Sequence, residues 1–221
     1  MPIQKTTPKK PIIIANWNAS TLTYSEAEKK IKDIYKNIDK NISKIQLTIA
    51  PTISQTAMLS AYFGGKITFT KKTSAKGKKG KKEVLPKVTF AGQDISVHEG
   101  GSKTGEVPVK AVKDAGATKV IIGHSECRER GDTLEMIIAK VKLALDAKLG
   151  VVLCVGEKQR DAGVAYLKVI DEQITSVFSS IDKSLHSQII LAYEPVWAIN
   201  NKDNIALDAH GLHSMVVYIR K

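Results

Sequence analysis

The run Ile189-Ile-Leu-Ala-Tyr-Glu-Pro-Val-Trp-Ala-Ile199 sets a carboxylate, Glu194, directly after an apolar segment and directly before a proline. A short segment that is apolar at consecutive positions is typical of a parallel strand buried on both faces. In α/β enzymes, catalytic side chains commonly stand at the carboxyl ends of such strands. The run therefore predicts an α/β fold and makes Glu194 a candidate base.

A second run repeats this design around an imidazole. In Val120-Ile-Ile-Gly-His-Ser-Glu126, His124 follows an apolar segment in the same way. A carboxylate and an imidazole at two strand ends of one sheet suit proton transfer next to a carbonyl group. Together the two runs point to an enzyme that moves protons.

Strand and helix signals alternate along the chain, which indicates βαβ units and a parallel sheet. The first helix is expected to begin with a capping box formed by Ser25 and Glu28. The pattern alone leaves a (β/α) barrel and an open, doubly wound sheet as alternatives. No Gly-x-Gly-x-x-Gly run opens a helix after the first strand, which counts against a dinucleotide fold. The six strand candidates are residues 12–15, 46–50, 88–92, 119–122, 151–155 and 189–192.

The composition is that of a soluble globular protein. A chain of 221 residues usually makes one domain or at most two, and 43% hydrophobic with 25% charged residues is ordinary for such a chain. No apolar run approaches the roughly 20 residues that span a bilayer, so we expect no membrane partner. We read Cys127 and Cys154, the only two cysteines, as reduced thiols of a cytoplasmic protein.

Several short runs of this chain are similar to those of the triosephosphate isomerase family, in the same order. The resemblance implies a single domain over residues 1–221, a TIM-type (β/α) barrel, and interconversion of dihydroxyacetone phosphate and glyceraldehyde 3-phosphate in glycolysis and gluconeogenesis. It implies neither a cofactor nor a metal. The runs are Ala15-Asn-Trp17, Phe90-Ala-Gly-Gln93, His98-Glu-Gly-Gly101, Thr104-Gly-Glu106, Gly123-His-Ser-Glu126, Leu153-Cys-Val-Gly-Glu157 and Ala192-Tyr-Glu-Pro-Val-Trp-Ala198.

The resemblance also implies roles for the residues that carry the chemistry. In triosephosphate isomerases a glutamate is the base, a neutral histidine polarises the carbonyl, and a loop closes over the site. Glu194 matches that base and His124 that histidine. Glu126 resembles a second glutamate that orients groups or shuttles protons. Its alternative is an ion pair with an arginine such as Arg128 or Arg130.

Three asparagines match substrate-binding positions, and two of them differ from the family. Asn16 aligns with a substrate-contacting asparagine. Asn18 stands where the family has a lysine, so it offers a hydrogen bond without the positive charge that neutralises the substrate phosphate and the developing oxyanion. Asn200 takes the place of a glycine in the lid, where a backbone amide binds phosphate. We expect these departures to lower turnover.

Two further residues match positions that support a dimer. Gln93 and the loop from His98 to Thr104 resemble a segment that reaches into a partner subunit. A threonine of that segment supports the neighbour's asparagine, and Thr104 would fill this role. The resemblance therefore implies a homodimer.

The lysine-rich stretch at residues 70–87 looks like an insertion in a family loop. Residues 66–87 hold nine lysines and one acid and so carry +8 of the net charge of +12. We expect a mobile surface loop whose flanks, 66–70 and 84–89, pair as a hairpin. It has no arginine and no interleaved aromatic residue for base stacking, so a solvated loop is expected and a nucleic-acid partner is not.

Compared with the family, the sequence matches six of eight βα units. The seventh and eighth strands, with their phosphate-binding loops, have no counterpart in it. We therefore expect strands one and six to be open edges, and the chain to be unstable alone or completed by another chain. The alternative to an active isomerase is an inactive fragment or pseudoenzyme that acts as a binding or scaffold protein. Such a protein would contact anions through the lysine-rich loop.

Overall fold

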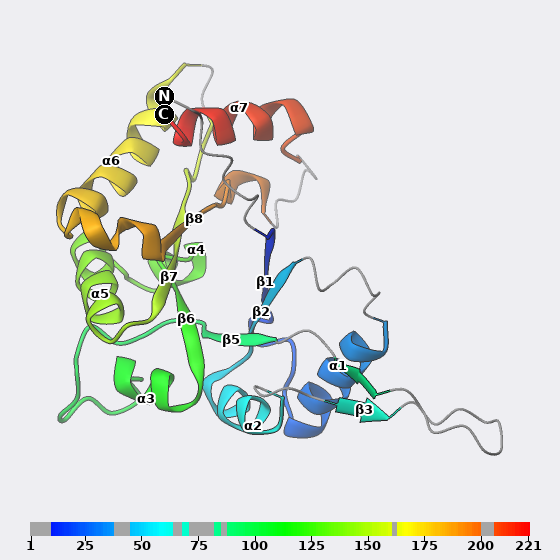
Figure 1. Cartoon of the computed structure of the whole chain (residues 1–221). Coiled ribbons are helices and arrows are strands. Elements are labelled where there is room, and N and C mark those ends of the chain that lie inside the picture. Colours follow the sequence, from blue (N-terminus) through cyan, green and yellow to red (C-terminus); the bar gives the residue numbers. More distant parts are fainter. Residues whose placement is uncertain are drawn as a thin grey trace, which may run out of the picture. The chain divides into compact units, whose positions relative to one another are not determined.

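The computed structural model describes residues 10–37, 45–63, 68–70, 82–84, 88–160, 163–199 and 206–221 (Figure 1). The chain divides into two compact units. The first unit comprises Met1–Gln93 and Ala111–Thr118. The second unit comprises Asp94–Lys110 and Lys119–Lys221.

The first unit contains three parallel strands and two long helices. The central strand β2 pairs on one side with β1 and on the other with β5. The register places Asn16, at the end of β1, beside Ala50 at the end of β2. The elements are β1 (Ile12–Asn16), α1 (Tyr24–Asn37), β2 (Gln46–Ala50), α2 (Ile53–Phe63) and β5 (Thr89–Gly92).

The first helix begins with a capping box, but not the expected one. The Thr23 hydroxyl accepts a hydrogen bond from the Glu26 amide, and the Glu26 carboxylate accepts from the amides of Leu22 and Thr23. These backbone hydrogen bonds lower the pKa of Glu26. The predicted pair was wrong because Ser25 lies inside α1, and Glu28 instead forms an ion pair with Lys32 one turn later.

The flanks of the lysine-rich stretch pair as expected, although with a shifted ladder. Strand β3 (Thr68–Thr70) pairs antiparallel with β4 (Lys82–Val84), so Phe69 lies opposite Glu83. The prediction had placed the second flank at residues 84–89. Residues 71–81 and 85–87 lie outside the described residues, and the expectation of a mobile surface loop there stays a prediction.

The second unit is built around the parallel strands β6, β7 and β8, in that order. Helices α5 and α6 lie side by side and both pack on β7 (Figure 1). The chain also forms α3 (Val109–Asp114), which begins directly after Pro108, a residue suited to a helix start. The elements that follow are β6 (Ala117–Ile122), α4 (Ser125–Glu129), α5 (Leu134–Asp146), β7 (Gly150–Val155), α6 (Ala165–Ser179), η2 (Lys183–Gln188), β8 (Ile189–Tyr193), η3 (Val196–Ala198) and α7 (Ala209–Ile219).

Burial separates the inner strands from the outer ones. Five of the six residues of β7 and four of the five residues of β2 are buried, as strands covered on both faces should be. By contrast, no residue of β1 or β8 is fully buried. Within the described part of the chain, β1 pairs only with β2, and β8 only with β7. This agrees with the expectation that these two strands are edges.

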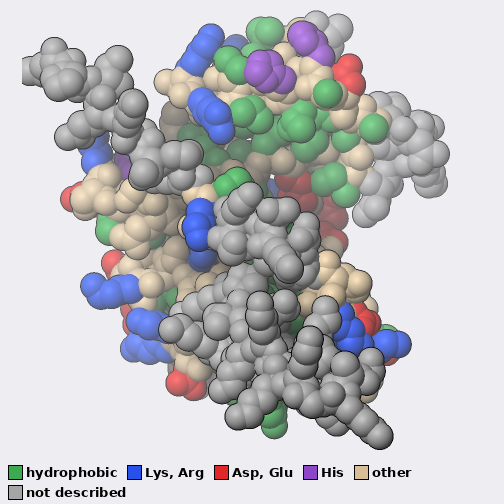
Figure 2. Space-filling model, turned by 45° about the vertical axis from the view of Figure 1, so that its right-hand side comes forward, with side chains coloured by type: hydrophobic (Ala, Val, Ile, Leu, Met, Phe, Trp, Pro, Cys, Tyr) green, Lys and Arg blue, Asp and Glu red, His purple; other side chains and the backbone are tan. Residues whose placement is uncertain are grey.

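The last helix also leaves apolar surface uncovered. Leu212 and Val217 of α7 are nearly half exposed, and His210 and His213 are exposed on the same helix. Figure 2 shows hydrophobic and histidine side chains together at the top of the view, over α7. None of the helices described here is long and apolar enough to cross a membrane.

Candidate active site

His124 stands at the carboxyl end of β6 and caps the short helix α4. Its Nδ1 accepts a hydrogen bond from the Glu126 amide at 3.3 Å. The residue before it, Gly123, has a φ of +76°, and an added Cβ would lie about 3 Å from Arg128 Nη2 and Cys154 O. Glycine is therefore required at this turn, both by its backbone angle and by the close packing.

Glu194 follows β8, and its carboxylate is held by the turn that carries His124. Glu194 Oε2 accepts a hydrogen bond from the Ser125 amide at 3.0 Å, and Oε1 lies 3.1 Å from His124 Nε2. The two side chains are only 16% and 18% exposed. The two strand ends that the sequence singled out therefore bring a carboxylate and an imidazole into direct contact.

The hydrogen bonds assign the tautomer of His124. Because Nδ1 accepts the proton of a backbone amide, it has no hydrogen of its own in this arrangement. The hydrogen of the neutral ring is then on Nε2, which points at Glu194. A neutral imidazole of this kind can donate a hydrogen bond to an oxygen that gains negative charge during a reaction.

Glu126 lies next to this pair but is more open to water. Its carboxylate is 3.8 Å from His124 Nδ1, and its side chain is 53% exposed. The alternative of an arginine ion pair was wrong for both named partners. Arg128 donates instead to the carbonyls of Gly123 and Cys154, at 2.8 and 3.1 Å, and Arg130 donates to Cys127 Sγ.

The first unit brings three of the predicted site residues together. Asn18 has a left-handed backbone with a φ of +48°, and its amide donates to Asn16 Oδ1 at 3.1 Å. Gln93 Nε2 donates to the Asn18 carbonyl at 2.7 Å and to the Ala50 carbonyl at 2.9 Å. Gln93 thus holds the turn that presents Asn18, and its predicted role in dimer and site support stays a prediction.

Two predicted site residues remain, Thr104 and Asn200. Thr104 is exposed on the loop that follows Glu99, as a residue that reaches a partner subunit would be. Asn200 lies outside the described residues. Their predicted roles stay predictions.

The structure adds a buried glutamate that the sequence reasoning did not single out. Glu157 is 1% exposed, and its carboxylate accepts hydrogen bonds from the Tyr193 hydroxyl at 2.9 Å and from Trp197 Nε1 at 2.8 Å. Burial, and then the hydrogen bond to Glu157, raise the pKa of Tyr193. The signal was a charged residue close after an apolar strand: one glycine separates Glu157 from β7, whereas Glu194 follows β8 directly.

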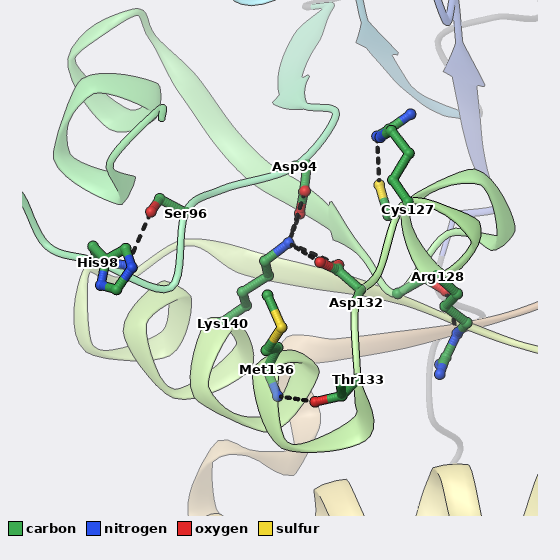
Figure 3. Close-up of polar contacts among 11 residues, drawn as sticks. Asp94, Ser96, His98, Cys127, Arg128, Asp132, Thr133, Met136 and Lys140 are labelled. Carbon is green, nitrogen blue, oxygen red and sulfur yellow. Dashed lines mark hydrogen bonds and ion pairs between the residues drawn. The ribbon is translucent and has the colours of Figure 1, made fainter. Parts of the chain in front are cut away.

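A buried charge cluster lies beside α4. Lys140 of α5 is 4% exposed, and its ammonium contacts both carboxylate oxygens of Asp94 and of Asp132 at 2.7–3.0 Å (Figure 3). Burial by itself would lower the pKa of Lys140, but its hydrogen bonds to Asp132 and Asp94 raise it overall. The cluster joins the segment after β5 to the turn between α4 and α5.

This cluster also contains the one group of potential metal ligands found among the described residues. Ligand atoms of Asp94, Cys127 and Asp132 lie within 4.8 Å of one another. The Lys140 ammonium already bridges the two carboxylates and offsets one of their two charges. The geometry is that of a structural ion pair.

Both cysteines are expected to resist thiol reagents in the folded protein. Burial raises the pKa of Cys127 to about 11 and that of Cys154 to about 12. At pH 8 a thiol with the lower of these pKa values is ionised in roughly one molecule in a thousand. Labelling with a disulfide reagent at pH 8 should therefore be slow in buffer and fast in 6 M urea. Fast labelling of the folded chain would contradict this burial.

The same shifts predict how stability depends on pH. Because the folded thiols hold their protons more tightly than the unfolded ones, their contribution is present in full below about pH 8.5, the ordinary thiol pKa. It is lost as the pH rises toward about 11 for Cys127. Urea titrations of wild type and Cys127→Ala at several pH values measure it, and the variant should show a shallower decline above pH 8.5.

The arrangement defines a class of protein. Parallel strands alternate with helices, and a carboxylate and a neutral imidazole meet at two strand ends, as in α/β enzymes that move protons next to a carbonyl. The family model for triosephosphate isomerase matches residues 11–220. A triosephosphate isomerase of Citrifermentans bemidjiense is 32% identical over 209 residues, which are 91% of this chain and 74% of that protein. The chain belongs to the triosephosphate isomerase family.

Two further relatives agree with this assignment. A triosephosphate isomerase of Coprinopsis cinerea is 42% identical over 115 residues, covering 51% of this chain and 45% of that protein. The crystal structure of triosephosphate isomerase from Bartonella henselae matches with a TM-score of 0.71 and 25% identity, over 95% of this chain and 74% of that one. The fold is accordingly an incomplete TIM-type barrel, and the doubly wound sheet is excluded.

Proposed function

We propose that this chain interconverts dihydroxyacetone phosphate and glyceraldehyde 3-phosphate, with Glu194 as the base and His124 as the electrophile. The observation that carries the proposal is the 3.1 Å contact between Glu194 Oε1 and His124 Nε2, in a ring whose Nδ1 accepts an amide hydrogen. Both groups are largely buried, so their hydrogen bonds act in a site of low polarity. Membership in the family supports the substrate.

The reaction follows from the chemistry of these two groups. The Glu194 carboxylate takes a proton from the carbon next to the substrate carbonyl, and the electron pair of the broken C–H bond forms an enediolate. His124 Nε2–H donates a hydrogen bond to the oxygen that gains negative charge. Protonated Glu194 then returns the proton to the neighbouring carbon, while the hydroxyl proton passes from its oxygen to the oxygen that carries the negative charge, which yields the other isomer.

Glu126 supports this chemistry from the outer side of His124. Its backbone amide holds Nδ1 as an acceptor, and its carboxylate lies 3.8 Å from the same nitrogen. We assign it an orienting role, in which its amide keeps the hydrogen of the ring on Nε2. Its exposed carboxylate is placed to exchange protons with water.

The remaining features of the proposal come from family membership. Asn16, Asn18 and the backbone of Asn200 bind the substrate. Gln93 supports Asn18 directly, because its Nε2 donates a hydrogen bond to the Asn18 carbonyl. Thr104 acts across a homodimer interface. No cofactor takes part, and the protein works in the cytoplasm, in glycolysis and gluconeogenesis.

The experiment is a coupled isomerase assay on the purified 221-residue chain, with Glu194→Gln as the matched blank. The glutamine keeps the shape of the side chain and removes the base. Turnover in wild type that falls at least about 100-fold in Glu194→Gln is the expected result, since a positioned base contributes about 10²–10⁴-fold. Equal rates in the two proteins would refute the proposal.

A second function is favoured by one observation, the neutral side chain at position 18. A family member without the substrate-neutralising lysine would keep the fold and act as a binding or scaffold protein. Thermal melting with 2-phosphoglycolate, whose carboxylate resembles the enediolate, separates the two functions. A clear rise in melting temperature supports a working substrate site, whereas no rise supports the non-catalytic alternative.

A further inference from the structure

The end of β7 carries the backbone of the segment that holds Glu194. The Glu194 amide donates to the Val155 carbonyl at 2.8 Å, and the Val196 amide donates to the Glu157 carbonyl at 3.1 Å. Between these two contacts, a Cβ added to Gly156 would lie only 1.9 Å from the Glu194 carbonyl oxygen. The position of Glu194 therefore depends on how this strand end is oriented.

Gly156 itself is held by a side chain from a helix. Gln173 of α6 accepts a hydrogen bond from the Gly156 amide through Oε1 at 2.9 Å and donates to the Gly156 carbonyl through Nε2 at 3.1 Å. The two bonds assign the orientation of the amide, since the reverse would set donor against donor. Both backbone groups of one residue are thus satisfied by one side chain.

Two features make this contact suited to positioning. Glycine has more backbone freedom than any other residue, so Gly156 needs an external hold if its orientation is to be unique. The β7–β8 ladder ends at Val155 paired with Tyr193, one residue before Gly156. A cavity of about 630 Å³ borders Gln173 and Gly156. If the glutamine amide is removed, water in this cavity can hydrogen-bond to the Gly156 amide and carbonyl, but it does not fix their orientation.

Helix α6 provides a rigid base for Gln173. Ile170 and Val177, three residues before and four residues after it, are fully buried. They are the buried residues of α6, a helix that packs against β7 and α5. The side-chain amide is therefore anchored to the core about one helical turn away on either side.

We propose that Gln173 is a positioning residue for Glu194, acting through Gly156. The inference rests on the proposed function, in which Glu194 is the base. Gln173 does not contact the reacting atoms. It fixes the strand end that holds the Glu194 backbone, and a displacement of about 1 Å at a catalytic group costs up to about 100-fold in rate.

Two variants and one control test the inference in the full chain. Gln173→Met keeps the length and apolar stem of the side chain but removes both hydrogen bonds. It should lower kcat about 10- to 100-fold with KM changed less than about threefold. Val177→Ala removes a buried contact of the same helix and should lower the melting temperature while kcat stays within about twofold of wild type.

The second variant, Gln173→Glu, gives a signature that a loss of stability would not produce. A carboxylate accepts from the Gly156 amide but repels its carbonyl, whereas a protonated carboxyl group imitates the glutamine amide. The neighbouring carbonyl disfavours the charged form and raises the carboxyl pKa above its usual value of about 4.3. The kcat of Gln173→Glu relative to wild type should therefore rise as the pH falls from 8 toward 5.5. The ratio for Gln173→Met should stay constant over this range.

The readouts separate the two possible failures. A kcat of Gln173→Met within twofold of wild type overturns the positioning role and leaves the proposed function intact. If wild type shows no more turnover than Glu194→Gln, the proposed function fails, and amide hydrogen exchange at Glu194 decides the inference alone. Exchange that is faster in Gln173→Met than in Val177→Ala supports positioning, and equal exchange overturns it.

Discussion

Replacing Asn18 with lysine is expected to raise kcat/KM of this chain at least about 100-fold. The family has a lysine at this position, and its charge neutralises the substrate phosphate and the developing oxyanion. Removing a single donor that stabilises an oxyanion costs about 10²–10³-fold in rate, and an ammonium adds a full charge to the hydrogen bond. Restoring the lysine at position 18 should therefore raise the rate by a factor of this size.

The backbone of the turn is prepared for this substitution. The two contacts that shape it are made by main-chain atoms, from the Asn18 amide to Asn16 Oδ1 and from Gln93 Nε2 to the Asn18 carbonyl. Both persist when the side chain changes. The φ of +48° tolerates asparagine better than lysine, so Asn18→Lys should lower the free energy of unfolding by about 1 kcal/mol.

The control for this prediction is Asn18→Met. Methionine is unbranched like lysine, only one heavy atom shorter, and has the same cost in the left-handed conformation, but it brings no charge. Steady-state kinetics of the three proteins at low ionic strength measure the effect. An increase in Asn18→Lys that is absent from Asn18→Met shows that charge is what the natural chain lacks. Equal kcat/KM values for the two variants would contradict the electrostatic argument.

Replacing Lys140 with methionine is expected to destabilise the chain by about 3–5 kcal/mol, the usual cost of removing one partner from a buried ion pair. The variant leaves the carboxylates of Asp94 and Asp132 facing each other without the ammonium that contacts all four of their oxygens. Asp132 is only 10% exposed in its side chain. Water can therefore replace few of the hydrogen bonds that the Lys140 ammonium made to these carboxylates.

The sign of the pH dependence gives a second measurement of the same effect. Burial raises the pKa of Asp94, and Lys140→Met removes the ammonium whose hydrogen bond and charge lower it. A protonated carboxyl group carries no charge and so avoids the cost of a buried charge without a partner. The loss of stability should therefore be largest at pH 7 and shrink as the pH falls toward 4. Urea unfolding followed by tryptophan fluorescence measures it at each pH.

The triple variant Asp94→Asn, Asp132→Asn, Lys140→Met is the matched control for this prediction. It removes all three charges together, and a buried ion pair that is replaced as a whole often costs little. We expect it to recover most of the stability lost in Lys140→Met. A triple variant no more stable than the single one would show that Lys140 acts through packing.

Strands were predicted well because their signal is local. Residues 46–50 were predicted and observed as the same strand, and the other five strands differ from their predicted bounds by one or two residues at an end. The capping box was misplaced because Thr23-x-x-Glu26 and Ser25-x-x-Glu28 fit the pattern equally well. The choice between them is made by the helix face that Ala27 and Ile31 bury in the core.

Of the candidate site, the sequence indicated the participants but not their contacts. His124 and Glu194 stood out because each polar residue comes at the end of an apolar strand. That they lie 3.1 Å apart, and that Nδ1 is an acceptor, depends on how α4 begins. Glu157 was passed over although it carried a similar signal, because only packing brings Tyr193 and Trp197 to it.

The sequence by itself determined the alternation of strands and helices, the two strand ends that carry a carboxylate and an imidazole, and the family. Hydrophobic periodicity and short motifs specify each of these within a few neighbouring residues. Only the tertiary structure decided that Gln173 holds Gly156 and that Lys140 joins Asp94 to Asp132. These contacts link positions 17, 46 and 8 residues apart, and no local pattern encodes them. They exist because α5 and α6 pack against β7, and packing fixes where long polar side chains end.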